Sequence, residues 1–163
     1  MGRATVRAQI ASYFAPANVA GLSAIYRARP NRIDPRVYNL SAGGGSGAVM
    51  VIHMPNDDET RLTLGPPTSA QKFNKHDISI EVLFQSVKVD AMAANDDLDA
   101  LIDAFMVRFR ADRTFGSTNG VPIWQAGEMP QGVKVEFGPP KLGKQNFIQN
   151  GVIRFQAWED VTG

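Results

Sequence analysis

The sequence predicts an α+β domain in which an antiparallel or mixed β-sheet packs against two main helices. Residues 78 to 84 alternate apolar and mostly polar side chains, the pattern of a strand with one buried face. Residues 96 to 113 place apolar side chains three and four positions apart, the pattern of an amphipathic helix. Strand-like and helix-like segments do not alternate along the chain, which disfavours a parallel doubly wound sheet. The expected order is helix, strands, helix, strands, with long loops between strands.

Chain length and composition favour a single domain over residues 1–163. A chain of 163 residues buries roughly 70% of its unfolded surface when it folds. No apolar run approaches the ~20 residues of a membrane helix, and Gln9, Ser12 and Pro16 interrupt any signal-type apolar core. The chain has no cysteine, which excludes disulfides and thiolate metal sites. We expect a protein made in the cytoplasm, with no membrane partner.

Residues 1 to 47 are expected to hold a helix, an extended segment and a flexible joint. An apolar stripe predicts the helix, which should end before Pro16. This stripe consists of Val6, Ile10, Tyr13 and Phe14. Residues 22–28 are typical of a short strand, and residues 36–40 should be irregular or extended. The glycine-rich residues 42–47 predict a flexible joint.

The middle of the chain predicts a hairpin, the alternating strand and the second helix. Residues 48–54 and 60–64 resemble strands, and the turn-forming residues 55–58 should join them. In the helix, Asn95 is the expected N-cap. Asp96, Asp97 and Asp99 should then lie at its start, where carboxylates complement the helix dipole.

One pattern occurs twice: a strand, Gly-Pro-Pro, a basic loop and another strand. Proline has no N–H to donate, so Gly-Pro-Pro should end strand pairing at residues 65–67 and 138–140. The first predicted loop carries Lys72, Phe73 and Lys75, and the second carries Lys141 and Lys144. Long loops on small domains are often contact elements; the alternative is two tolerated surface loops. The remaining predicted strands are residues 121–125, 133–137 and 151–158.

Charge is unevenly distributed although the formal net charge is +1. Residues 1–40 contain six arginines and one acidic residue, whereas residues 89–163 contain ten acidic and seven basic residues. One interpretation is an ordinary solvated surface. The other is a molecule whose unlike sides meet in a head-to-tail contact, because heterologous interfaces need two complementary patches. Nucleic-acid recognition is disfavoured by the near-zero net charge and by the lack of an RNA-binding signature.

Few residues are suited to catalysis. Gly43, Gly45 and Ala48 match a dinucleotide-binding spacing, and Ser46 has a neighbourhood like that of a nucleophile, but a β-rich segment follows where both motifs need a helix. His53 and His76 are the only histidines, and nearby carboxylates make a small His/carboxylate metal-dependent enzyme the alternative hypothesis. Their spacing fits no ligand pattern, so we expect no catalytic, cofactor-binding or metal-binding residues and no enzyme activity.

The order of elements resembles that of the tail-terminator (tail-completion) family of long-tailed bacteriophages. The resemblance covers nearly the whole chain and depends on pattern features more than on fixed residues. These features are the helix at 5–14, the extended residues 25–30, the hairpin ending at 62–65, the strand at 78–87, the acid-started helix at 96–113 and the closing strand at 153–155.

The resemblance implies a structural virion protein that forms a ring, usually of six subunits, at the head-proximal end of the tail. Such a ring caps the tail tube, ends its polymerisation and joins it to the head connector. It implies a homo-oligomer whose partners are the tail tube protein and a head-side connector or stopper protein, with passing contact to genomic DNA in the lumen. Assembly would occur in the host cytoplasm. The alternative is another head–tail joining (neck) protein or a tail tube protein.

Two groups of residues are candidates for contacts in such an assembly. The helix and the sheet should build contacts between subunits, with candidate residues Arg27, Arg29, Arg32, Asp96, Asp97, Asp99 and Arg108. The two basic loops should meet an adjacent ring or face the lumen, with candidate residues Lys72, Phe73, Lys75, Lys141 and Lys144.

Overall fold

The computed structural model describes residues 3–61, 71–116, 125–126, 132–143 and 146–162. Its helices and strands follow the predicted order of helix, strands, helix, strands, so the α+β fold class is confirmed. The elements are α1 (Arg3–Tyr13), β1 (Leu22–Tyr26), the 3-10 helix η1 (Pro35–Tyr38), β2 (Ser46–Arg61), β3 (Gln71–Ser86), α2 (Ala91–Ala111), β4 (Gln125–Ala126), β5 (Lys134–Phe137), β6 (Lys141–Leu142) and β7 (Phe147–Thr162).

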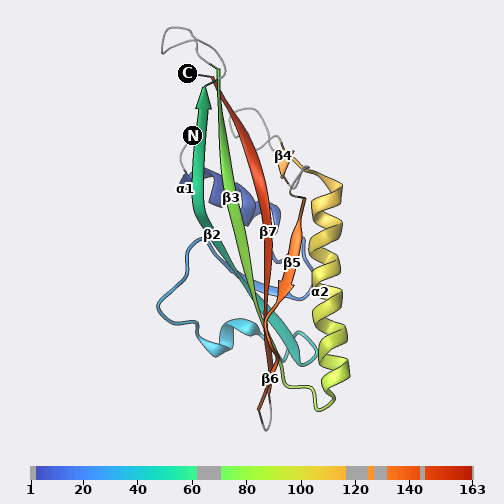
Figure 1. Cartoon of the computed structure of the whole chain (residues 1–163). Coiled ribbons are helices and arrows are strands. Elements are labelled where there is room, and N and C mark those ends of the chain that lie inside the picture. Colours follow the sequence, from blue (N-terminus) through green and yellow to red (C-terminus); the bar gives the residue numbers. More distant parts are fainter. Residues whose placement is uncertain (1–2, 62–70, 117–124, 127–131, 144–145, 163) are drawn as a thin grey trace.

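The strands form one mixed sheet around β3 (Figure 1). The strand order is β1-β2-β3-β7-β4, and β5 and β6 pair with β7 beside β4. Only β1 and β2 run parallel; every other described pair is antiparallel. The strands β2, β3 and β7 each have 16 residues. Because β1 pairs only with residues 48–51 of β2, the three long strands continue past it as a projecting end, formed by residues 55–61, 71–77 and 156–162.

Both helices bury their apolar stripes against one face of the sheet. This face receives alternate side chains of β3, including Ile78, Ile80 and Val82, as the period of two predicts. A cluster of aromatic side chains packs between the helices and β7. It consists of Tyr13, Phe14, Phe105, Phe109, Phe115 and Phe155. No described helix is long and apolar enough to cross a membrane.

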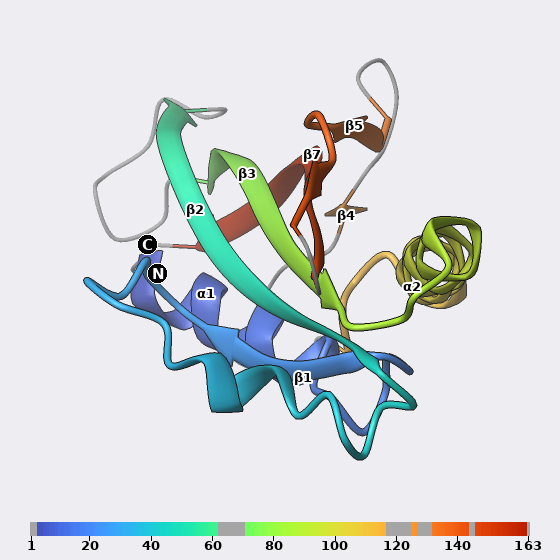
Figure 2. The ribbon, with the colours of Figure 1, turned by 90° about the horizontal axis from the view of Figure 1, so that it is seen from below.

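A smaller cluster covers the lower part of the opposite face. Val49, Val51 and Leu83 are buried there beneath the residues around η1, which lie beside β1 (Figure 2). The glycine-rich residues form a hydrogen-bonded turn that leads into β2, in which Gly43 and Gly47 lie close to backbone atoms and Gly44 faces open space. A Cβ added to Gly47 would lie 2.0 Å from the carbonyl oxygen of Tyr38, and one added to Gly43 would lie 2.1 Å from that of Ser46. Glycine is required here because two backbone segments approach closely.

Two other expectations about local structure are wrong. Residues 55–58 do not form a hairpin turn, because β2 continues through them with a shift of register between His53 and Asn56. This shift is a β-bulge that accommodates Pro55, which cannot donate to a strand ladder. The helix begins at Ala91, with Asp90 as its N-cap, and not after Asn95. Residues 62–64 and 121–124 of the predicted strands lie outside the described residues.

We predict that Gly47→Ala lowers the free energy of unfolding by about 1–3 kcal/mol, the usual cost of overpacking. The reason is that the added Cβ meets backbone, which cannot move aside as a side chain can. Chemical denaturation monitored by circular dichroism measures this change. Gly138→Ala is the matched control, since its added Cβ would find its nearest atom at 3.4 Å. A neutral Gly47→Ala would instead support a flexible joint.

Candidate functional site

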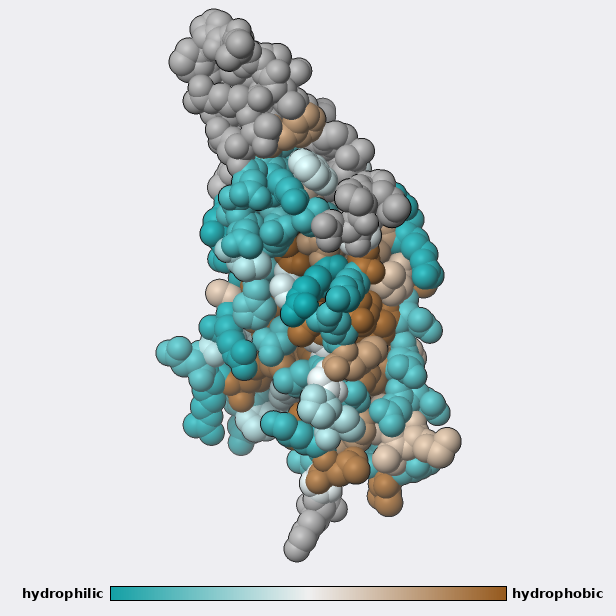
Figure 3. All heavy atoms as spheres, viewed as in Figure 1, coloured by the Kyte–Doolittle hydropathy of each residue, from teal (hydrophilic) through white to brown (hydrophobic). Residues whose placement is uncertain are grey.

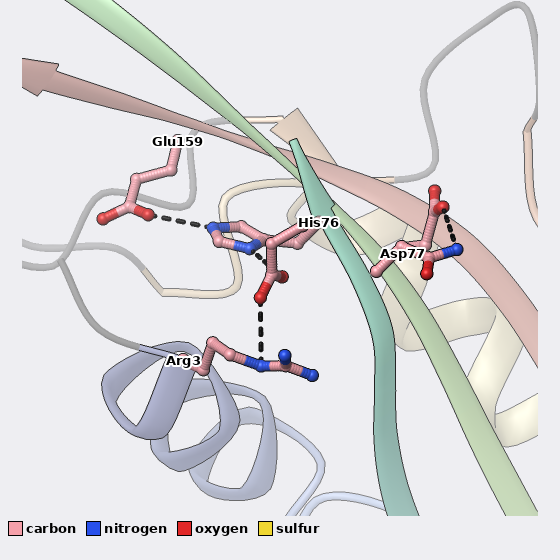
Figure 4. A network of polar contacts seen from close by, with 6 residues as sticks. Arg3, His76, Asp77 and Glu159 are labelled. Carbon is pink, nitrogen blue, oxygen red and sulfur yellow. Dashed lines mark hydrogen bonds and ion pairs between the residues drawn. The ribbon is translucent and has the colours of Figure 1, made fainter. Parts of the chain in front are cut away.

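At the base of the projecting end, a partly buried cluster of polar side chains joins three strands to α1 (Figure 4). The imidazole of His76 lies between two carboxylates, with Nδ1 2.7 Å from Asp57 and Nε2 2.9 Å from Glu159. Arg3, in the first turn of α1, contacts the other oxygen of Asp57 at 3.0 Å. The side chains of His76 and Glu159 are 3% and 1% exposed. We call these four residues the His76 cluster.

The β-bulge in β2 sets up this cluster. One extra residue between His53 and Asn56 places Asp57 directly opposite His76, whereas a regular ladder would have placed Asn56 there. Towards the projecting end, the apolar stripe of the core gives way to Asp57 on β2, His76 on β3 and Glu159 on β7. The His76 cluster therefore ends the hydrophobic core.

The contacts of the His76 cluster link the strands to α1, and they give no support to a metal site. Both ring nitrogens of His76 lie within hydrogen-bonding distance of carboxylate oxygens. Within the described ranges, no group of three His, Asp or Glu side chains could hold a metal ion. His53 cannot join His76, because it pairs with Ser79 and therefore faces the other side of the sheet. Its Nε2 lies 3.1 Å from Glu81.

An open groove of about 570 Å³ crosses the sheet face opposite the helices. Its lining includes His53, Asp77, Lys134, Arg154 and Gln156. Most of these polar groups are matched within the chain: Gln156 donates to Asp77 at 2.9 Å. Glu136 contacts Lys134 at 2.7 Å and Arg154 at 2.5 Å. The hydrogen bond from Lys134 holds the pKa of Glu136 below its ordinary value. The charged side chains at the groove are therefore largely neutralised by one another.

The end of the molecule opposite the projecting end exposes several apolar side chains. Hydrophilic side chains gather over the upper part of the view in Figure 3, and hydrophobic ones are exposed at the lower end. The exposed apolar residues of this end are Val87, Val89, Met92, Leu142 and Ile148. Val87, Val89 and Leu142 line a second groove of about 410 Å³ between the β3–α2 connection and β6. The two ends of one sheet therefore differ in chemistry.

The residues of the first predicted contact loop lie in a strand. Lys72, Phe73 and Lys75 belong to β3, where each pairs with both β2 and β7, so placing them in a loop is wrong. They still lie in the projecting end, and the Lys75 ammonium lies 5.8 Å from the ring centre of Trp158. Of the second loop, Lys141 starts the short strand β6 and is exposed, and Lys144 lies outside the described residues.

Several of the predicted interface residues are engaged within the chain. Arg29 lies 3.4 Å from Glu81. Asp97 contacts Lys88 at 2.6 Å and accepts a hydrogen bond from Ser46 at 2.5 Å. Burial alone would raise the pKa of Asp97, but the hydrogen bonds from Lys88 and Ser46 outweigh it and hold that pKa below its ordinary value.

Arg108 is likewise occupied. Its guanidinium stacks over the Tyr13 ring at 4.2 Å and donates to the Tyr13 carbonyl at 3.2 Å, so it fastens α2 to α1. The other candidates, Arg27, Arg32, Asp96 and Asp99, are exposed. Sequence reasoning missed Glu159 as a partner of His76, because residues 83 positions apart in the chain meet only through strand pairing. The sequence signal that could have identified Glu159 is that it is polar, whereas the other buried residues of its stripe in β7 are apolar.

We predict that His76→Ala lowers the free energy of unfolding by about 1–3 kcal/mol, because it removes the side chain that contacts the buried carboxylate of Glu159. Arg3→Ala is the control within the same cluster. Its side chain is 48% exposed, so the loss should stay below about 1 kcal/mol. Denaturant titration of both variants provides the comparison, and equal small losses would show that the cluster does not support the fold.

Comparisons with known proteins identify no family. No protein-family model matches the chain, and no curated protein matches it. One solved structure, of a protein whose name states no function, aligns with 96% of this chain and 96% of its own, at 12% sequence identity and a TM-score of 0.45. A likeness at that level carries no argument about function, which has to be inferred from the residues of this chain.

Proposed function

We propose that this chain is a structural virion protein that forms a ring at the head-proximal end of a phage tail. In this role it caps the tail tube, ends tube polymerisation and joins the tube to the head-side connector. Its partners are further copies of itself, the tube protein and a connector or stopper protein, with genomic DNA passing through the lumen. It works as an assembly element of the virion, without catalysis.

The observation that carries this proposal is the difference between the two ends of the sheet. One end projects as three long strands whose described side chains include Asp57, Asp58 and Lys75, and the other exposes Val89, Met92 and Leu142. Exposed apolar groups of this kind usually mark contact surfaces. A ring located between a tube and a connector needs two unlike axial faces, because it binds a different protein on each. The difference between the two ends therefore supports a protein that lies between two different binding partners.

A neck protein or a tube subunit with the same plan is the alternative. The two roles differ in how they assemble: tube subunits stack without limit, whereas a terminator forms one ring and stops. Heterologous contacts that close give rings, and those that do not close give filaments.

Electron microscopy and sedimentation of the purified protein, alone and with isolated tail tubes, test the proposal. We expect closed rings with a central hole, and one such ring at one end of each tube. Long stacks in the absence of tubes would favour the tube-subunit alternative. A protein that stays a single subunit in both conditions would contradict the proposed function.

We predict that the double variant Lys72→Glu and Lys75→Glu forms rings but no longer caps tubes, because two positive charges in the projecting end would become negative. Co-sedimentation with tail tubes measures capping. Lys141→Glu, at the other end of the sheet, is the matched control and should cap as the unaltered protein does. Normal capping by the double variant would show that the projecting end does not contact the tube.

A further inference from the structure

We propose that neighbouring copies in the ring contact each other through the exposed acidic stripe of α2 on one copy and an arginine segment beside β1 on the next. This inference rests on the proposed function, because it assigns the contact that closes the ring. The acidic stripe is Asp96, Asp99 and Asp103; the arginine segment is Arg27, Arg32 and Arg36 within residues 27–38.

The acidic stripe occupies the solvent side of α2. Asp96, Asp99 and Asp103 are three and then four residues apart, so their side chains share one face of the helix, opposite its buried stripe. All three are exposed. Met92 and Val107 flank them on the same face and are 74% and 59% exposed. A surface with central charges and apolar flanks can bury area as well as pair ions.

These carboxylates do not stabilise α2. Because α2 begins at Ala91, its first turn contains no acidic residue, and the macrodipole acts mainly on that turn. Asp96 and Asp99 are therefore too far along the helix to gain much from it. Like charges three or four residues apart destabilise a helix by roughly 0.2–0.5 kcal/mol per pair. None of the salt bridges among the described residues includes Asp96, Asp99 or Asp103.

The arginine segment is the matching surface. Residues 27–38 contain four arginines and one aspartate. Arg29 is held by Glu81, while the guanidinium groups of Arg27, Arg32 and Arg36 take part in no ion pair among the described residues. Asp34 lies beside Arg32 and Arg36, but its carboxylate accepts the backbone N–H of Arg36 as the cap of η1. Three exposed guanidinium groups thus match three exposed carboxylates.

The two surfaces lie on opposite sides of the molecule. Figures 1 and 2 both place residues 27–38 beside β1, at one side of the sheet, and α2 at the other side. A contact between them cannot form within one copy. Between copies it is heterologous, with different surfaces on the two partners, and this is the contact type that builds rings. The requirement for two complementary surfaces on opposite sides is met.

A second copy fits the arginine segment better than DNA does. A nucleic-acid surface is expected to carry a large excess of positive charge, whereas the acids of α2 and the arginines of this segment balance within a chain of formal net charge +1. Charge balance of this kind is what a self-complementary assembly needs, because complementary potentials set the register of a contact.

Charge-reversal variants provide the test. The acid variant carries Asp96→Lys, Asp99→Lys and Asp103→Lys, and the base variant carries Arg27→Glu, Arg32→Glu and Arg36→Glu. Each alone should fold, as judged by circular dichroism, and lose ring formation in sedimentation velocity, because like charges then face each other. Asp58→Lys is the matched control, since Asp58 is exposed on the projecting end, and it should form rings as the unaltered protein does.

An equimolar mixture of the two variants should restore rings. In an alternating ring, lysines of one variant face glutamates of the other, and the remaining contacts keep the original aspartates and arginines. Recovery therefore requires a direct contact between these two surfaces. High salt should weaken the unaltered rings, because the Debye length falls to about 3 Å at 1 M.

Each other outcome overturns the inference in a distinguishable way. If the unaltered protein forms rings and both variants do too, the contact lies elsewhere and the proposed function stands. If only the base variant changes, and it loses binding to duplex DNA while still forming rings, the arginine segment is a nucleic-acid surface. If the unaltered protein remains a single subunit with and without tail tubes, the proposed function fails together with the inference.

Discussion

The pairing of β3 with β7 along all 16 of its residues, and with β2 from Lys72 to Ser86, is the constraint on which the rest of the structure depends. Since a strand places alternate side chains on opposite faces, this single register decides which residues of three strands face the helices. A shift by one residue would turn Ile78, Ile80 and Val82 outwards and bring Ser79 and Glu81 into the core. The positions of both helices follow, because their apolar stripes have only this face to cover.

The same register explains how one sheet acquires two unlike ends. Along the inward stripe of β3, apolar residues continue from Phe84 to Ile78 and then give way to His76. In the neighbouring strands, the bulge in β2 places Asp57 opposite His76, and β7 supplies Glu159 two residues beyond Ala157, the partner of His76 in the ladder. Ordered polar partners close the core there, so the long strands can project beyond the helices without exposing an apolar face.

Sequence patterns could predict the elements whose stability depends on local periodicity. The apolar stripes of α1 and α2 and the alternation in β3 and β7 were sufficient, because each pattern repeats several times within one element. Residues 55–58 were misassigned, because Pro, Asn and Asp favour turns locally while pairing with β3 keeps them in a strand. The start of α2 was placed too late for a related reason: Ala91, Ala93 and Ala94 favour a helix but add little to its apolar stripe.

The candidate contact residues were only partly predictable, because sequence gives a residue's charge but not its partner. Arg29, Asp97 and Arg108 looked equivalent to their neighbours in the sequence, yet folding pairs each of them with a residue far along the chain.

Asp103 and Arg36 were not among the predicted interface residues, but both are charged and exposed. Internal pairing has therefore divided the charged residues into two classes. Those in contact within the chain hold α2 and the 27–38 segment in place, and those left exposed include three aspartates on α2 and three arginines beside β1, on opposite sides of the molecule. Three like charges along one helix destabilise it unless an oppositely charged partner neutralises them. Selection for helix stability alone would remove them, so their presence favours a partner that neutralises them.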